Sequence, residues 1–194
     1  MINYYYLDIE TGADENLSAL YSENIKPNGT LKDPEKIKED LAKKHAEAKE
    51  KMCVDKDFSK IKMIGLRYGG EYHRLTLEDF ANFQLPTNSV FVTFNGLKFD
   101  FPVIIRGLVK AGLTGDAITL KKCLDRFSPY HIDLLDRLSA FGEFKSLDHY
   151  SQIYLGKSKK PIDFLTCSDE ELEQHNAEDL LILEELHKKF INHI

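Results

Sequence analysis

The chain has 194 residues, 42% of them hydrophobic, and a formal net charge of −6 at pH 7. This length and the 9 tyrosines and 12 phenylalanines can fill one large core, so we expect a single domain. The acidic balance gives no sign of the basic surface that is typical of nucleic-acid-binding proteins, and no apolar run approaches the roughly 20 residues of a membrane span. Because the N-terminus also lacks the order of a secretory signal, we expect a cytoplasmic protein without a membrane contact.

The first predicted element is a strand in the opening "MINYYYLDIETG" that ends with two acidic residues. Its tyrosines, leucine and isoleucine are typical of a strand, and side chains alternate faces, so Asp8 and Glu10 point the same way. Two like charges this close repel each other, and burial would raise their pKa values. We therefore expect something positive between them.

Residues 12–58 follow as a polar, charged segment that we interpret as a helical insertion in the single domain. Asp33 before Pro34 is typical of a helix start. The following helix carries only a thin apolar stripe of Ile37, Leu41 and Met52, which indicates a solvated surface helix. Three cysteines, odd in number and far apart, argue against a disulfide framework and are interpreted as small apolar residues: Cys53, Cys123 and Cys167.

In the rest of the chain, after residue 58, we expect strands and helices to alternate. Two strands joined at Gly69-Gly70, a buried strand "SVFVTFNG" and a helix ending near Gly112 come first. Either "DAITLKKCL" or "YHIDLL" could be the last strand of the sheet. A helix beginning near Ser146 or Asp148 and a C-terminal helix with a capping box complete the chain. This order predicts an α/β layer with a mixed central sheet.

Acidic residues recur at the ends of these elements. Asp100 lies between two phenylalanines after the buried strand, and Asp179 follows His175 by four residues, so both share one helix face. Taken singly, each has an ordinary explanation: Asp8 or Asp100 as a cap, Glu10 as a strand-end charge, and His175 as a surface residue. Their joint occurrence, in this order and on these elements, favours one shared site.

Three of these stretches resemble the motifs of a known family. "LDIET" (7–11), "FNGLKFDFP" (94–102) and "HNAEDL" (175–180) are similar to the motifs of the DnaQ-like (DEDD) 3′-5′ exonucleases. Residues 131–160 resemble the version related to the exonuclease domain of B-family DNA polymerases. The resemblance spans nearly the whole chain except the insertion, and it implies a ribonuclease H-like three-layer fold with a mixed central β-sheet flanked by helices.

The resemblance implies a metal site made of Asp8, Glu10, Asp100 and Asp179, which would hold two Mg²⁺ or Mn²⁺ ions. Carboxylate oxygens suit these hard cations, and two ions can stabilise the attacking and leaving oxygens in phosphodiester hydrolysis. The ions would also be the positive charge expected between the first two carboxylates.

The third motif departs from the family pattern, which has Tyr four residues or His five residues before the last Asp. Here His175 stands four residues before Asp179. A neutral imidazole with a pKa near 6.5 can accept a proton from the attacking water. We therefore predict that His175 occupies the water-orienting position.

Two further residues, Thr11 and Asn95, are assigned by the same resemblance, and the others by their own surroundings. Thr11 and Asn95 would lie near the terminal nucleotide or brace the site, and Phe99 either stacks on a base or fills the core. Asp133 and Asp136 are assigned to structure. Three lysines either meet phosphates or form a solvated basic loop: Lys157, Lys159 and Lys160.

The sequence thus predicts a metal-dependent 3′-5′ exonuclease that removes nucleotides from single-stranded DNA 3′ ends, alone or with a replication or repair partner in trans. DNA is favoured over RNA only because the polymerase-related version is the most similar one. Three alternatives remain: a 3′-5′ exoribonuclease, a non-catalytic module of the same fold that binds nucleic acid or a partner, and a structural domain with incidental acids.

Overall fold

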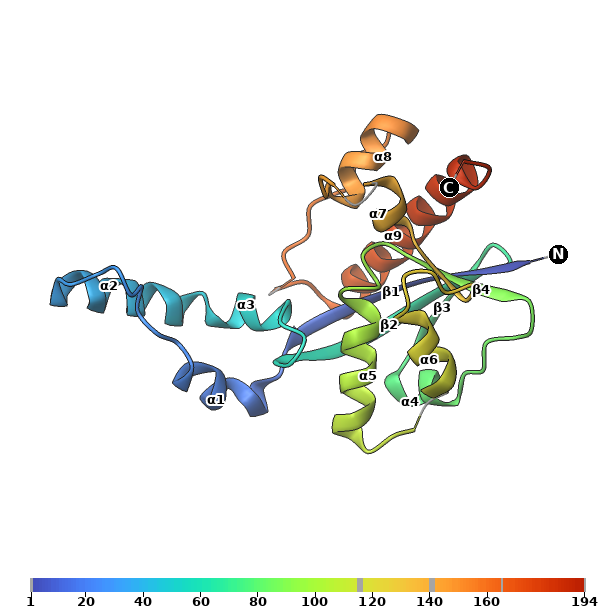
Figure 1. The fold of residues 1–194 in the computed structure, drawn as a ribbon. Coiled ribbons are helices and arrows are strands. Elements are labelled where there is room, and N and C mark those ends of the chain that lie inside the picture. Colours follow the sequence, from blue (N-terminus) through green and yellow to red (C-terminus); the bar gives the residue numbers. More distant parts are fainter. Residues whose placement is uncertain (1, 115–116, 140–141, 165, 194) are drawn as a thin grey trace. The chain divides into compact units, whose positions relative to one another are not determined.

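The computed structural model describes residues 2–114, 117–139, 142–164 and 166–193 (Figure 1). The chain divides into two compact units, one made of residues 1–10 and 61–194 and the other of residues 11–60. The larger unit carries the predicted acidic residues. The interpretation of residues 12–58 as an insertion in a single domain stays a prediction.

Within the described residues, five strands form one sheet in the order β3-β2-β1-β4-β5. The hairpin β2–β3 is antiparallel, whereas β1 pairs in parallel with β4, and β4 with β5. The mixed sheet is therefore confirmed. The strand bounds are β1 (Asn3–Ala13), β2 (Ser59–Tyr68), β3 (Glu71–Leu75), β4 (Ser89–Thr93) and β5 (His131–Asp133).

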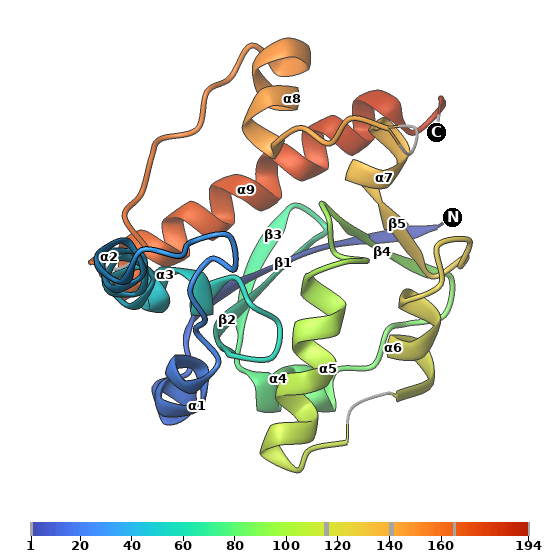
Figure 2. The ribbon, with the colours of Figure 1, turned by 60° about the vertical axis from the view of Figure 1, so that its left-hand side comes forward.

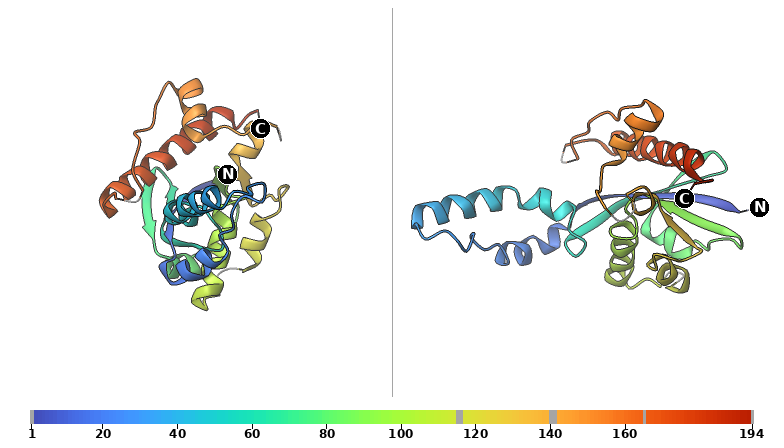
Figure 3. Two further views of the ribbon diagram at one scale, coloured as in Figure 1. Left: turned by 90° about the vertical axis from the view of Figure 1, so that its left-hand side faces the viewer. Right: turned by 45° about the horizontal axis from the view of Figure 1, so that its top comes forward.

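Helices cover both faces of this sheet (Figures 2 and 3). Neighbouring residues of β1 bury themselves on opposite faces: Leu7 packs in one hydrophobic cluster with Phe101 of α5, and Tyr6 packs in the other with Leu183 of α9. This three-layer α/β arrangement is the predicted one and is consistent with a ribonuclease H-like fold. One face carries α4 (Leu77–Asn82), α5 (Asp100–Ala111) and α6 (Ala117–Cys123), and the other carries α7 (Leu134–Leu138), α8 (Leu147–Leu155) and α9 (Asp169–Phe190).

The ambiguity over the last strand is resolved. "YHIDLL" contains β5, whereas residues 117–123 of "DAITLKKCL" form α6, and residue 116 lies outside the described part. Gly69 and Gly70 have φ values of 60° and 87°, as the tight turn between β2 and β3 requires. Ser146 caps α8, accepting a hydrogen bond from the backbone N–H of His149, and Asp148 lies inside the first turn.

The smaller unit contains η1 (Glu15–Leu17), α1 (Ser18–Glu23), α2 (Pro34–Ala46) and α3 (Ala48–Cys53). Asp33 caps α2 as predicted, and none of the α2 side chains is buried. The predicted helix to Met52 is divided into α2 and α3 at Glu47, whose backbone has φ −84° and ψ −4°.

The cysteines are free thiols, with Cys123 buried and Cys53 and Cys167 half-buried. Across the part of the chain that the structure describes, we find no helix with the length and apolar character needed to cross a membrane.

A buried histidine gives the fold a pH dependence of its own. His187 is 0% exposed, and its Nδ1 lies 3.1 Å from the Tyr6 hydroxyl. Burial, and then the charge of Lys188, lower the pKa of His187 to about 4. The unfolded chain, with a pKa near 6.5, therefore binds a proton more readily than the folded one between about pH 4 and 6.5.

The contribution of His187 to the free energy of unfolding should be complete above about pH 6.5 and be lost as the pH falls towards 4, with a slope of at most about 1.4 kcal/mol per pH unit. Urea unfolding at a series of pH values should show a shallower dependence in His187→Gln than in the wild type. The exposed His193→Gln is the matched control. Identical slopes in all three proteins would contradict this account.

Candidate functional site

Two predicted carboxylates lie on one side of β1. The alternation of the strand places Asp8 and Glu10 together, and Glu10 is only 7% exposed. The side chain of Asn176, on α9, reaches both: its Nδ2 donates to Asp8 Oδ2 over 2.8 Å and lies 3.5 Å from Glu10 Oε1. A neutral amide thus contacts the pair from the helix above the sheet.

Asp100 is the first residue of α5 and follows β4. Because β1 and β4 are parallel, their carboxyl ends meet at the same edge of the sheet, which brings Asp100, 3% exposed, towards Asp8. The connecting turn passes through Asn95, whose φ is 71°. Asp133 fixes this turn, because its carboxylate accepts from the backbone N–H groups of Asn95 (2.9 Å) and Leu97 (3.0 Å).

A buried hydrogen-bond chain supports the same turn. His131 Nδ1 lies 2.8 Å from the Cys123 carbonyl, which can only accept, so this nitrogen carries the proton. Nε2 then accepts from Thr93 Oγ1 over 2.7 Å, and Thr93 Oγ1 accepts from the Gly96 N–H over 3.1 Å. A Cβ at Gly96 would lie 2.2 Å from Thr93 Oγ1, so this approach requires glycine. Burial lowers the pKa of His131, which keeps the ring neutral.

The third element of the site is α9. His175 and Asp179 share one face of this helix, with 3.7 Å between His175 Nε2 and Asp179 Oδ2. Lys159, from the connection between α8 and α9, places its Nζ 2.5 Å from the same Asp179 oxygen. The other oxygen, Oδ1, is buried and has no hydrogen-bond partner among the residues that the structure describes. Asp179 therefore offers a free acceptor inside the site.

The predicted carboxylates act on one another electrostatically. Burial, followed by the charges of Asp100, Glu10 and Asp179, raises the pKa of Asp8 well above its usual range. Burial and the charge of Asp179 raise the pKa of Glu10 to about 7. For Asp100, burial and then the charge of Asp133 raise the pKa to about 8. Lys159 opposes the shifts at Asp8 and Glu10. The four carboxylates therefore form one cluster in which the charge of one acid disfavours the ionisation of its neighbours.

Within residues 2–114, 117–139, 142–164 and 166–193, no group of three or more His, Cys, Asp or Glu side chains is arranged to hold a metal ion. The donor chemistry nevertheless fits a hard divalent cation, because the cluster offers carboxylate oxygens and, on Asp179, a buried acceptor without a hydrogen-bond partner among the described residues. The assignment of these residues as metal ligands stays a prediction.

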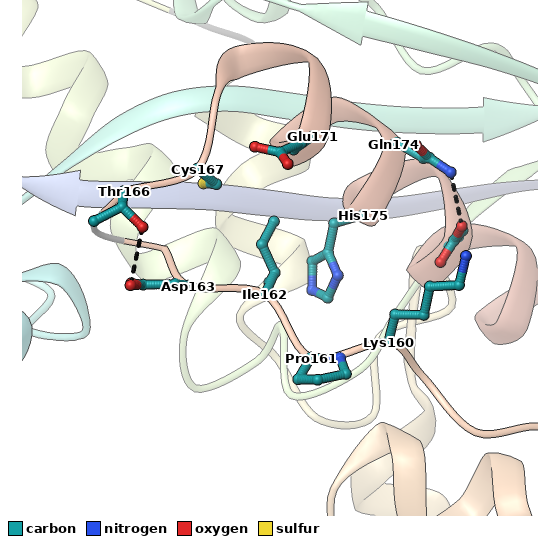
Figure 4. Close-up of a pocket in the computed structure, with 10 residues that line it drawn as sticks. Lys160, Pro161, Ile162, Asp163, Thr166, Cys167, Glu171, Gln174 and His175 are labelled. Atoms are coloured by element: carbon teal, nitrogen blue, oxygen red, sulfur yellow. Dashed lines mark hydrogen bonds between the residues drawn. The ribbon is translucent and has the colours of Figure 1, made fainter.

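A pocket of about 430 Å³ lies between α9 and the segment that precedes it, and His175, the neighbour of Asp179, lines it (Figure 4). His175 points into it from α9, and Phe164 packs edge-to-face on the imidazole with 5.3 Å between ring centroids. Burial lowers the pKa of His175, so the ring is neutral near pH 7. The lining residues are Lys160, Pro161, Ile162, Asp163, Thr166, Cys167, Glu171, Gln174, His175 and Glu178.

The residues predicted to contact the substrate lie in several different places. Phe99 is half-buried and packs against the hydrophobic cluster, which favours the core-filling alternative. Thr11 belongs to the smaller unit, where its hydroxyl donates to the Cys53 carbonyl over 2.6 Å. Of the three lysines, Lys157 pairs with Glu185, Lys159 with Asp179, and Lys160 lines the pocket.

Sequence reasoning missed Asn176 and its two supports. The Tyr72 hydroxyl donates to Asn176 Oδ1 over 3.2 Å, and Gly65 leaves the space that the amide occupies. An isolated glycine in the apolar strand "IKMIGLRY" was an available signal, because such a glycine often marks a close approach of another group.

No family model and no curated protein matches the sequence. Among solved structures, the chain is similar to the family B DNA polymerase from the hyperthermophilic archaeon Pyrobaculum calidifontis, with a TM-score of 0.54 and 13% sequence identity. The match covers 98% of this chain and 25% of the polymerase chain, so the chain spans about a quarter of that protein's length. At this identity the likeness establishes a shared fold.

Proposed function

We propose that the protein is a metal-dependent 3′-5′ exonuclease that hydrolyses the terminal phosphodiester bond of single-stranded DNA. The observation that carries the proposal is the cluster of Asp8, Glu10, Asp100 and Asp179, which come from three elements and lie close enough for their charges to raise the pKa values of Asp8 and Glu10. The fold shared with a DNA polymerase supports a function connected with nucleic acid.

In this proposal the four carboxylates hold two Mg²⁺ or Mn²⁺ ions. When bound, the ions would stabilise the negative charge that develops on the attacking and leaving oxygens. Their positive charge would also offset the repulsion in the cluster and attract a phosphate to an otherwise acidic protein.

His175 is suited to receive a proton from the attacking water. Its imidazole is neutral, it faces the pocket, and it stands next to Asp179, which can stabilise the protonated ring. Lys159 offsets the charge of Asp179, and its ammonium group can instead contact a phosphate oxygen of the substrate. Asn95, whose turn carries Asp100, would brace the site.

A second candidate is a non-catalytic module that binds nucleic acid. Two observations favour it: in the described part of the chain no side-chain group is arranged to hold a metal ion, and Lys159 already compensates Asp179. Such a module would bind oligonucleotide equally well with and without Mn²⁺ and would cleave none.

The test is digestion of a 5′-labelled single-stranded DNA oligonucleotide with Mg²⁺ or Mn²⁺, resolved on a gel. We expect a ladder that shortens from the 3′ end, and no cleavage with EDTA or in the Asp100→Asn variant. A matched RNA oligonucleotide should be degraded more slowly, and faster RNA degradation would favour an exoribonuclease. No cleavage of either substrate by folded protein would contradict the proposed function.

A further inference from the structure

Asn176 is a buried polar residue at the centre of the site, yet nothing in the proposed chemistry uses it. It is 0% exposed and lies beside His175 on α9. Consecutive helical residues point about 100° apart, so while His175 faces the pocket, Asn176 faces β1. Among the residues that the structure describes, its amide donates to the two carboxylates of the strand.

The hydrogen bonds fix the orientation of this amide. The carboxylates of Asp8 and Glu10, when ionised, only accept, so the NH₂ group must face them. Oδ1 then faces Tyr72 and accepts from its hydroxyl over 3.2 Å. Burial raises the pKa of Tyr72 to about 12, so this hydroxyl keeps its proton at neutral pH.

The sheet has a space shaped for this side chain. A Cβ built on Gly65 of β2 would lie 1.7 Å from Asn176 Oδ1 and 2.8 Å from its Cγ. Any residue other than glycine at this position would therefore displace the amide. Gly65 and Tyr72, from two neighbouring strands, together form the socket of Asn176.

We infer that Asn176 is a positioning residue that holds the carboxylates of Asp8 and Glu10 at a fixed spacing, with Gly65 and Tyr72 as its socket. One NH₂ group has two hydrogens, so it can bridge two acceptors that repel each other. Because the amide is neutral, it leaves the negative charge of both carboxylates available to a cation. It also ties α9, which carries His175 and Asp179, to the strand that carries the first motif.

The inference rests on the proposed function, and its test uses two substitutions that separate hydrogen bonding from packing. Asn176→Leu keeps about the same size but cannot donate, whereas Asn176→Ala also leaves a cavity. Both should lower kcat on single-stranded DNA and weaken Mn²⁺ binding in isothermal titration, each by about 10-fold or more, with KM for DNA little changed. The exposed Asn82→Leu is the matched control and should behave as the wild type.

If Asn176→Ala loses kcat and Mn²⁺ affinity but Asn176→Leu retains both, the role of Asn176 is packing and the inference is overturned. Unchanged values in both variants would overturn it as well. If the wild type binds Mn²⁺ but cleaves nothing, the proposed function fails while the titration still decides the role of Asn176. A wild type that binds no Mn²⁺ would overturn the inference directly.

A double-mutant cycle tests the socket without any metal or substrate. Gly65→Ala should lower the melting temperature of the wild type clearly, and lower that of Asn176→Ala less, because the clash with the amide is then gone and only the contact with Leu180 Cδ1, 2.9 Å from the added Cβ, remains. Equal losses in both backgrounds would show that Gly65 does not serve Asn176, and would remove the socket from the inference.

Discussion

Asp8→Asn is expected to lower the rate of DNA cleavage by about 10³-fold or more and, at the same time, to make the protein more stable. The carboxylate of Asp8 is partly buried among three others, and burial together with their charges raises its pKa well above the usual range. An uncharged amide of the same size removes this repulsion. At pH 7 and without divalent cations, the free energy of unfolding should rise by about 1 kcal/mol, which is several degrees in Tm for a chain of this size.

The dependence of folding stability on pH has a definite sign. Acids whose pKa is raised by folding bind more protons in the folded state, so they lower stability as the pH rises from about 4 towards 8, where Asp100 titrates. The stability of Asp8→Asn should fall less over this range than that of the wild type. The control is Asp169→Asn. Because the Asp169 side chain is 76% exposed, the free energy of unfolding of this variant should change by no more than about 0.5 kcal/mol. A less stable Asp8→Asn would contradict the electrostatic account.

Local patterns in the sequence were sufficient to predict much of the fold. The alternation in β1 placed Asp8 and Glu10 on one side, the Gly69-Gly70 pair predicted the turn between β2 and β3, and the caps of α8 and α9 were recognisable. These features depend on neighbouring residues alone. The short β5 was ambiguous, because its three residues acquire strand structure from pairing with β4.

Contacts between distant segments could not be predicted. Asn176 meets Asp8 across 168 positions, and the fit of its amide over Gly65 depends on the packing of α9 against the sheet. Lys159 was recognised only as part of a basic loop, and its approach to Asp179 follows from the path between α8 and α9. Asp133 was assigned to structure, but its attachment to the turn before Asp100 required coordinates.

Asp133→Ala should have the largest effect on stability. The buried carboxylate accepts from four backbone N–H groups: those of Asn95, Leu97, Leu135 and Asp136, at 2.9 to 3.4 Å. It thus caps α7 and at the same time holds the turn that leads into α5. Its removal leaves several N–H groups without an acceptor, and we expect a loss of about 3 kcal/mol in the free energy of unfolding.

The matched control is Asp125→Ala. That carboxylate is exposed and accepts from one backbone N–H, of Phe127, over 3.0 Å, so its loss should cost no more than about 1 kcal/mol. Urea unfolding of both variants would measure the difference. If Asp133→Ala does not fold, Asp133→Asn replaces it in the test. This variant keeps one acceptor oxygen, so its free energy of unfolding should fall by less than the loss of about 3 kcal/mol expected for the alanine variant.

Asp133→Asn also tests whether the hydrogen bonds from Asp133 to the turn before Asp100 matter for the proposed chemistry. The turn from Asn95 to Phe99 sets the position of Asp100, so cleavage should fall by about 10-fold or more under conditions where the variant is fully folded. Asp125→Ala should cleave at the wild-type rate. Full activity in a folded Asp133→Asn would show that the turn keeps Asp100 in place without the carboxylate, and that the buried chain from His131 through Thr93 to Gly96 is the sufficient support.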